Sequence, residues 1–262
     1  MADARKPRLA LKVRQLRRPD KSAYELHHSE DQHRDIRGGA ARATVFGVSD
    51  GLVSNVSLIL GIEGTHPLSA VVRLAGLAGL LGGALSMAAG EYISMRAQTE
   101  LFEHELEVER AEIHGSPESE LYELVQIYES RGIDPAMATE LADKMMSAPE
   151  LALRTHAREE LGIDPADLGS PIQAAAASFV SFAIGALIPL LPFLFVGRSV
   201  RSGPVFVTLA LAAVAALLVG GSLALFTGRP WWRSALRQLV ICAAAGAITF
   251  GVGAAIGASG FA

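Results

Sequence analysis

The chain has 262 residues, of which half are hydrophobic, 19% are charged and one is a cysteine. Its formal net charge of −4 is unevenly spread, because residues 1–43 hold 11 of the 23 Lys and Arg while residues 97–170 hold 18 of the 27 Asp and Glu. A single cysteine excludes an intrachain disulfide framework, and long charge-free stretches exclude an ordinary soluble domain.

Five apolar windows predict five transmembrane helices. They cover residues 45–62, 74–90, 172–197, 202–228 and 239–262, and the only charge in them is Asp50. Apolar stretches of this length span a bilayer. The predicted fold class is therefore an all-α polytopic membrane protein with a small cytoplasmic helical metal-binding domain. Its expected parts are a basic tail (1–43), transmembrane helices 1 and 2 (44–96), an acidic helical domain (97–170) and transmembrane helices 3 to 5 (171–262).

The basic tail predicts the orientation. It is polar and rich in arginine, without the apolar region of a secretory signal. By the positive-inside rule, its Lys and Arg place it in the cytoplasm. With five spans, the acidic helical domain is then cytoplasmic and the C-terminus lies outside. A basic amphipathic segment at residues 9–16 can lie on anionic membrane lipid.

The first window carries an acid within a face of small residues. Its members recur at helical spacing and are Gly47, Asp50, Gly51, Ser54, Ser57 and Gly61. Small residues let a second helix approach closely. A carboxylate at membrane depth is costly, so Asp50 is predicted to be an ion ligand or a proton site. The alternative is an aspartate near the interface, paired with a polar neighbour.

Residues 74–114 contain no obvious helix breaker and predict one helix of two characters. Such a helix is roughly 60 Å long at ~1.5 Å per residue, about twice the hydrocarbon thickness of a bilayer. Met87 and Glu91 lie one turn apart on its small-residue face. A thioether beside carboxylates suits a borderline divalent metal better than Mg²⁺ or Ca²⁺. The alternative is that Met87 only fills apolar space.

The second half of this helix is strongly acidic. One stripe contains Glu100, Glu103 and Glu107, and a second, on roughly the opposite side, contains Glu105, Glu109 and Glu112. No lysine stands at i,i+4 to these acids, so a bound cation would stabilise the helix. The competing interpretation is a solvated acidic surface.

Three shorter helices are predicted next, over residues 117–132, 134–146 and 149–162. In the last of them, His156 can share a face with Glu159 or Glu160 and form part of a metal site. Salt bridges of these acids to Arg154 or Arg158 are an equally good explanation. In the third transmembrane window, Pro189 and Pro192 predict a kink or break.

Several motifs together resemble the vacuolar iron transporter family. They are FGVSDGLVSN, ALSMAAGEY, the acidic extension, EELGI and GALIPLLPFLF, and the resemblance covers about residues 42–262. It implies five membrane helices with the N-terminus inside and a homodimer with the ion path between subunits. It also implies proton-coupled export of Fe²⁺, often also Mn²⁺, from the cytosol, with cytoplasmic helices that gather the metal.

By motif, Asp50 and Met87 match the membrane site of the family. Glu109, Glu112 and Glu160 match its cytoplasmic site. Glu100 and Glu103 match less closely. Where plant members carry two further acids near the membrane site, this chain has Ala43 and Gly79, and Glu91 offers a replacement. His156 stands where the family has a methionine. The candidate metal ligands are therefore Asp50, Met87, Glu91, Glu100, Glu103, Glu109, Glu112, His156 and Glu160.

The predicted function is proton-coupled export of Fe²⁺, with Mn²⁺ as a second substrate. The predicted partners are divalent metal ions, protons, membrane lipid and a second copy of the chain, with no nucleic acid. The protein is expected to be no enzyme, to hold no prosthetic group and, if bacterial, to reside in the cytoplasmic membrane. The alternative is a membrane-anchored, ferritin-like iron-binding ferroxidase, although the chain lacks the paired Glu-x-x-His motifs of such centres.

Overall fold

The computed structural model describes residues 39–259 except 167, 196, 198–203 and 228–229. Most of the predicted basic tail, with its amphipathic segment at residues 9–16, lies outside the described residues. Residues 39–262 cluster as one unit.

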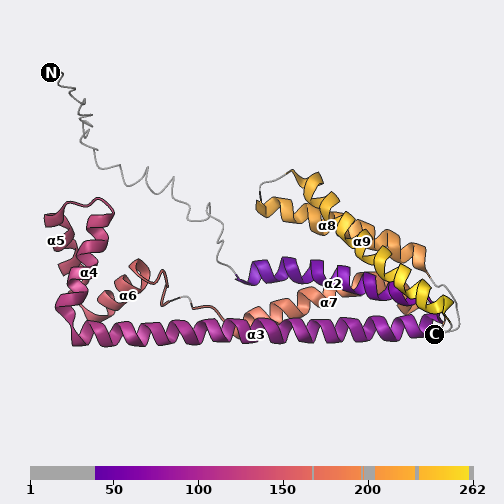
Figure 1. Cartoon of the computed structure of the whole chain (residues 1–262), viewed down its shortest axis with the longest axis horizontal. Helices are drawn as coiled ribbons and strands as arrows, with labels where there is room; N and C mark the ends of the chain where they lie inside the picture. Colours follow the sequence, from indigo (N-terminus) through magenta and orange to yellow (C-terminus); the bar gives the residue numbers. More distant parts are fainter. Residues whose placement is uncertain (1–38, 167, 196, 198–203, 228–229, 260–262) are drawn as a thin grey trace, which may run out of the picture. The chain divides into compact units, whose positions relative to one another are not determined.

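The described residues form helices, which confirms the all-α fold class (Figure 1). In chain order they are α2 (Gly39–Glu63), α3 (Ser69–Gly115), α4 (Pro117–Ser130), α5 (Pro135–Met145), α6 (Pro149–Glu159), α7 (Pro171–Phe195), α8 (Val205–Thr227) and α9 (Trp231–Ala258). Prolines in the first turn of α4, α5 and α6 suit a position whose N–H has no intrahelical partner. These three helices therefore begin where the sequence predicts them.

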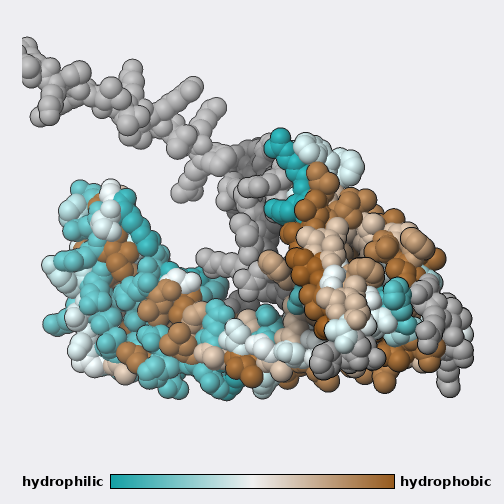
Figure 2. All heavy atoms as spheres, turned by 45° about the vertical axis from the view of Figure 1, so that its right-hand side comes forward, coloured by the Kyte–Doolittle hydropathy of each residue, from teal (hydrophilic) through white to brown (hydrophobic). Residues whose placement is uncertain are grey.

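Five of the helices are long and apolar enough to cross a membrane, as predicted. They are α2 from Thr44, α3, α7, α8 as far as Ala224, and α9. Helix α9 begins at Trp231, well before the predicted start at residue 239. Hydrophobic residues gather over these helices and hydrophilic residues over α4–α6 (Figure 2). The protein is an integral membrane protein with a hydrophilic helical extension.

Helix α3 is one continuous helix that joins both regions (Figure 1). It has 47 residues and is therefore about 70 Å long at ~1.5 Å per residue. It packs against α7 and α2 within the membrane bundle and against α6 and α4 beyond it. The prediction of a single helix with two characters is confirmed.

Helix α2 is the centre of the bundle and packs against α7, α9, α3 and α8. Its apolar side chains Leu52 and Val56 are buried with Cys242 of α9. Close approach to α7 depends on glycines from both helices. A Cβ atom at Gly51 would collide with the carbonyl of Phe182, and one at Gly185 with the carbonyl of Val48. The backbones are in direct contact there, as in small-residue helix packing.

The predicted small-residue face of α2 does not meet a single neighbour as a whole. Gly47 and Gly51 face α7, whereas Asp50 and Ser54 are exposed at the surface of the bundle. Of the kink or break predicted for α7, the break is wrong, because the helix continues through Pro189 and Pro192 as far as Phe195. Polar side chains of other helices bond to its backbone, as is typical of proline-containing membrane helices. Thr208 donates to the Pro189 carbonyl at 3.3 Å.

We predict that Gly185→Leu destabilises the bundle. The added side chain meets the α2 backbone, which cannot move aside, and overpacking of this kind costs about 1–3 kcal/mol or more. The measurement is thermal unfolding of the purified protein in detergent. Gly251→Leu is the matched control, since a Cβ there has no heavy atom within 4 Å. Equal melting temperatures for both variants would contradict the close-packing assignment.

Candidate metal sites

The acidic helical domain has a small apolar core with polar residues at its edge. Leu124 and Tyr128 of α4 pack against Ala138 and Ala142 of α5. A second cluster joins Ile113 of α3 to Ala152 and Leu153 of α6. The first cluster joins α4 to α5 and the second joins α3 to α6, and the buried faces of α3, α4 and α6 also carry charged groups.

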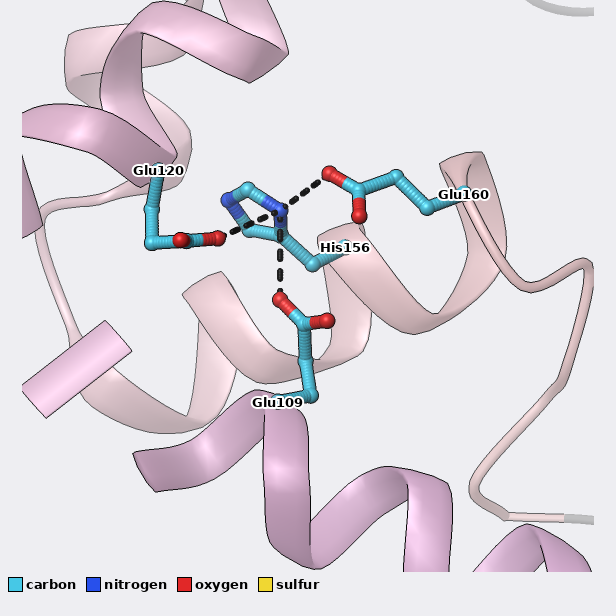
Figure 3. Close-up of side chains that lie close together, drawn as sticks. All are labelled: Glu109, Glu120, His156 and Glu160. Carbon is cyan, nitrogen blue, oxygen red and sulfur yellow. Dashed lines mark hydrogen bonds and ion pairs between the residues drawn. The ribbon is translucent and has the colours of Figure 1, made fainter. Parts of the chain in front are cut away.

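Four side chains from these helices converge on one point (Figure 3). The Nδ1 atom of His156 lies 2.7 Å from Glu160 Oε1, 3.3 Å from Glu109 Oε1 and 3.7 Å from Glu120 Oε2. One ligand atom from each residue can be chosen so that all four lie within 4.8 Å of one another. We call this group the carboxylate–histidine cluster.

Three of the four residues in the cluster are buried. His156 is fully buried, Glu109 is 4% exposed and Glu120 is 6% exposed, while Glu160 is accessible. Among the described residues, the Nε2 atom of His156 and the Oε1 atom of Glu109 have no hydrogen-bond partner. Buried polar atoms are normally paired. These two buried atoms are therefore available to a ligand that the described protein groups do not supply.

The carboxylates of the cluster repel one another. Burial, together with the nearby Glu160 carboxylate, raises the pKa of Glu109 to about 7, although His156 opposes the rise. Burial also raises the pKa of Glu120, with a contribution from Glu123. A divalent cation would remove this repulsion. Three carboxylates and one imidazole suit Fe²⁺, Mn²⁺ and similar ions.

The structure places the predicted acidic-domain ligands in two groups. Glu109, His156 and Glu160 come together. Glu100, Glu103 and Glu112 are exposed outside the cluster, and Glu100 pairs with Arg96 at 2.8 Å. Of the competing salt bridges, Arg158 bonds to Asp164 at 2.7 Å and Arg131 pairs with Glu159.

Glu120 is a member that the sequence reasoning missed. It lies on the buried face of α4 together with Leu124 and Tyr128, at i, i+4 and i+8. A carboxylate at the head of an apolar stripe was the available signal. The described residues contain one group of this kind, whereas the di-iron alternative needs ligands for two ions.

A second candidate site lies within the membrane bundle. An open cleft of about 340 Å³ is lined by Asp50, Ser54, Asn55, Leu58, Gly79, Gly83, Ser86, Met87 and Phe182. The structure thus places Asp50 of α2 and Met87 of α3 on one cleft. Ser54 donates a hydrogen bond to Asp50 Oδ1 at 3.0 Å. Glu91 is half-buried and does not line this cleft.

The fold and these two sites define a class: a polytopic membrane protein in which one helix connects a membrane cleft to a carboxylate-rich cluster. The comparisons with known proteins agree with this class. The model of the VIT family matches residues 41–254, and the chain belongs to the VIT family.

Three curated relatives illustrate the similarity. "Vacuolar iron transporter 1" of Oryza sativa is 31% identical over 237 residues, covering 90% of this chain and 93% of its own. "Vacuolar iron transporter" of Acanthamoeba castellanii is 36% identical over 231 residues, covering 85% and 82%. "Vacuolar iron transporter 1" of Arabidopsis thaliana is 30% identical over 232 residues, covering 88% and 91%.

We predict that, without metal, the acidic helical domain loses stability as the pH rises from about 4.5 to about 7. The pKa of Glu109 is about 7 in the folded protein and near 4.5 when it is free of these neighbours. An acid with a raised folded-state pKa favours folding at low pH, and this contribution is lost as the pH rises through the window.

The measurement is amide hydrogen exchange of α4 and α6 in the intact, metal-free protein, corrected for the intrinsic pH dependence. Glu109→Gln should weaken the pH dependence, whereas Glu118→Gln, at an exposed position of α4, should leave it unchanged. Addition of Mn²⁺ should restore protection near pH 7, because a cation favours the ionised carboxylates. A pH-independent exchange pattern in the unmodified protein would contradict the assignment.

Proposed function

We propose that this protein is a proton-coupled transporter that moves Fe²⁺, and also Mn²⁺, out of the cytosol. One observation carries the proposal. The helix that lines the membrane cleft with Met87 also brings Glu109 into the carboxylate–histidine cluster. Membership of the VIT family and the names of its relatives support iron as the substrate.

The proposed topology places the acidic helical domain in the cytoplasm and the C-terminus outside. The Lys and Arg residues of the N-terminal tail support this orientation. The tail also offers contacts to anionic lipid. If the host is bacterial, the cytoplasmic membrane is the expected location. A homodimer, implied by the family resemblance, is part of the proposal.

The cluster is proposed to capture the ion. Three carboxylates attract a divalent cation, and the imidazole of His156 supplies a nitrogen ligand. Glu160 lies on the accessible side, where it can replace a water molecule bound to the incoming ion, while Glu109 and Glu120 are buried. The ion would enter past Glu160 and be held by the buried acids.

Transport is proposed to proceed through the membrane cleft, where Asp50 and Met87 bind the ion after its release from the cluster. Metal and protons compete for the same carboxylates, because a protonated carboxylate no longer binds a cation. A higher proton concentration outside would therefore release the ion there. In this scheme the protons that displace the ion come from outside and are released into the cytosol, so protons move inward as the metal moves outward.

We expect Glu109→Gln to weaken Mn²⁺ binding to the acidic helical domain by about tenfold or more, which corresponds to about 1.4 kcal/mol. The amide removes a negative ligand from a buried site. The measurement is equilibrium Mn²⁺ binding to the full chain in detergent, with Asp50→Asn present in every sample to remove the membrane site.

Glu103→Gln is the matched control for that experiment. Glu103 lies on the same helix but is exposed outside the cluster, so its variant should bind as the parent does. An equal loss in both variants would indicate that the acidic surface as a whole attracts the ion and that the cluster is not a defined site.

We expect Asp50→Asn to remove metal transport while leaving folding largely intact, because Asp50 is exposed at the cleft. The measurement is uptake of Fe²⁺ and Mn²⁺ into proteoliposomes under an imposed pH gradient. Asp143→Asn, at an exposed position of α5, should transport normally. Undiminished transport by Asp50→Asn would remove this residue from the mechanism.

A further inference from the structure

Asn55 of α2 is a polar residue of the membrane cleft for which the mechanism above has no use. It lines the cleft with Asp50 and Met87, yet only 2% of it is exposed. Within the described part of the chain, its Oδ1 atom has no hydrogen-bond partner. A buried amide oxygen without a partner is costly in a membrane protein, so this position calls for a ligand.

The orientation of the amide follows from its other contact. The Nδ2 atom of Asn55 donates a hydrogen bond of 2.6 Å to the carbonyl oxygen of Ala186 in α7. Turning the amide over would place its oxygen against that carbonyl oxygen, which is repulsive. The nitrogen therefore belongs on α7 and the oxygen on the opposite side.

The oxygen points toward α3 at Gly79. A Cβ atom built at Gly79 would lie 3.0 Å from Asn55 Oδ1. The end of the Leu58 side chain lies beside the same point, and a leucine end can move. Glycine at position 79 therefore lets the amide oxygen and the Leu58 side chain approach the α3 backbone, and any larger residue would collide with one of them.

We propose that Asn55 Oδ1 is a third metal ligand in the membrane cleft, beside the Asp50 carboxylate and the Met87 thioether. The inference rests on the proposed function and adds a specificity-determining residue to it. A neutral amide oxygen is a hard donor and favours Mn²⁺ and Fe²⁺ over softer ions, whereas a thioether favours softer ones. Asn55 thus offsets the preference that Met87 alone would give.

Two variants separate this role from a structural one. Asn55→Asp keeps an oxygen ligand and loses the amide donor to Ala186. Gly79→Ala keeps that hydrogen bond and covers the oxygen. Asn55→Leu removes both. The matched control is Gly82→Ala, on the same helix, where a Cβ has no heavy atom within 4 Å.

The experiment is Mn²⁺ binding to the full chain in detergent, with Glu109→Gln and Glu160→Gln present throughout to weaken the acidic cluster. Competition by Cd²⁺, a softer ion, is measured in parallel. Uptake of Mn²⁺ into proteoliposomes under a pH gradient is measured with Asn55, Gly79 and Gly82 variants of the otherwise unmodified chain.

We expect Asn55→Leu and Gly79→Ala to weaken Mn²⁺ binding by about tenfold and about threefold, on a scale where 1.4 kcal/mol is tenfold. Cd²⁺ should be affected less, so the Mn²⁺/Cd²⁺ preference falls. Asn55→Asp should bind Mn²⁺ at least as well as the parent, and Gly82→Ala should match it. A purely structural Asn55 would instead make Asn55→Asp harmful and Gly79→Ala neutral, with both ions affected equally, and that result would overturn the proposal.

Failure of the proposed function has a different signature. If the parent protein takes up no metal under a pH gradient, transport is refuted, while the binding series still decides whether Asn55 is a ligand. If the parent transports Mn²⁺ and the Asn55 variants bind and transport as it does, the inference alone is overturned.

Discussion

Three carboxylates around one buried imidazole are the constraint on which the hydrophilic half of this protein depends. Glu109, Glu120 and Glu160 come from three different segments and meet at His156. Their mutual repulsion opposes the packing of α4 and α6 against α3, while the apolar contacts of Ile113 and Leu153 favour it. A cation in the cluster would convert the repulsion into attraction. Folding of this domain and metal binding are then aspects of one equilibrium.

Because α3 is continuous, it joins the carboxylate–histidine cluster to the membrane cleft. Met87 and Glu109 lie 22 residues apart on one helix, which corresponds to about 33 Å at ~1.5 Å per residue. Because a helix is stiff over this length, the two sites keep a fixed separation and cannot merge. An ion must leave one set of ligands before it meets the other. In the proposed function, the cluster therefore serves capture, and selection and release fall to the membrane cleft.

Local rules predicted the elements well. Hydropathy identified the five membrane helices, and the predicted starts of the three short helices lie within one residue of the observed ones. Partner choice was less predictable because it depends on packing between helices. Glu112 looked as good a ligand as Glu109, but three residues further along the helix it points about 60° away from Glu109 and is exposed. Glu120 became a cluster member only through the contact of α4 with α3 and α6. Glu159 and Glu160 were equivalent by spacing, and the pairing of Arg131 with Glu159 separates them.

In the membrane helices, too, the sequence pattern does not predict which neighbour each residue faces, and the packing between helices decides it. Gly47, Asp50 and Gly51 share a helical spacing, so periodicity assigns them to one face, yet the glycines face α7 and the acid faces the cleft. Glycine at 51 and 185 lets the two backbones touch, and that contact brings the Asn55 amide to the carbonyl of Ala186. The hydrogen bond then turns the amide oxygen toward α3. The close packing of α2 against α7 thus determines that the amide oxygen of Asn55 faces α3. An ion in the cleft beside α3 would therefore meet this oxygen and not the amide nitrogen.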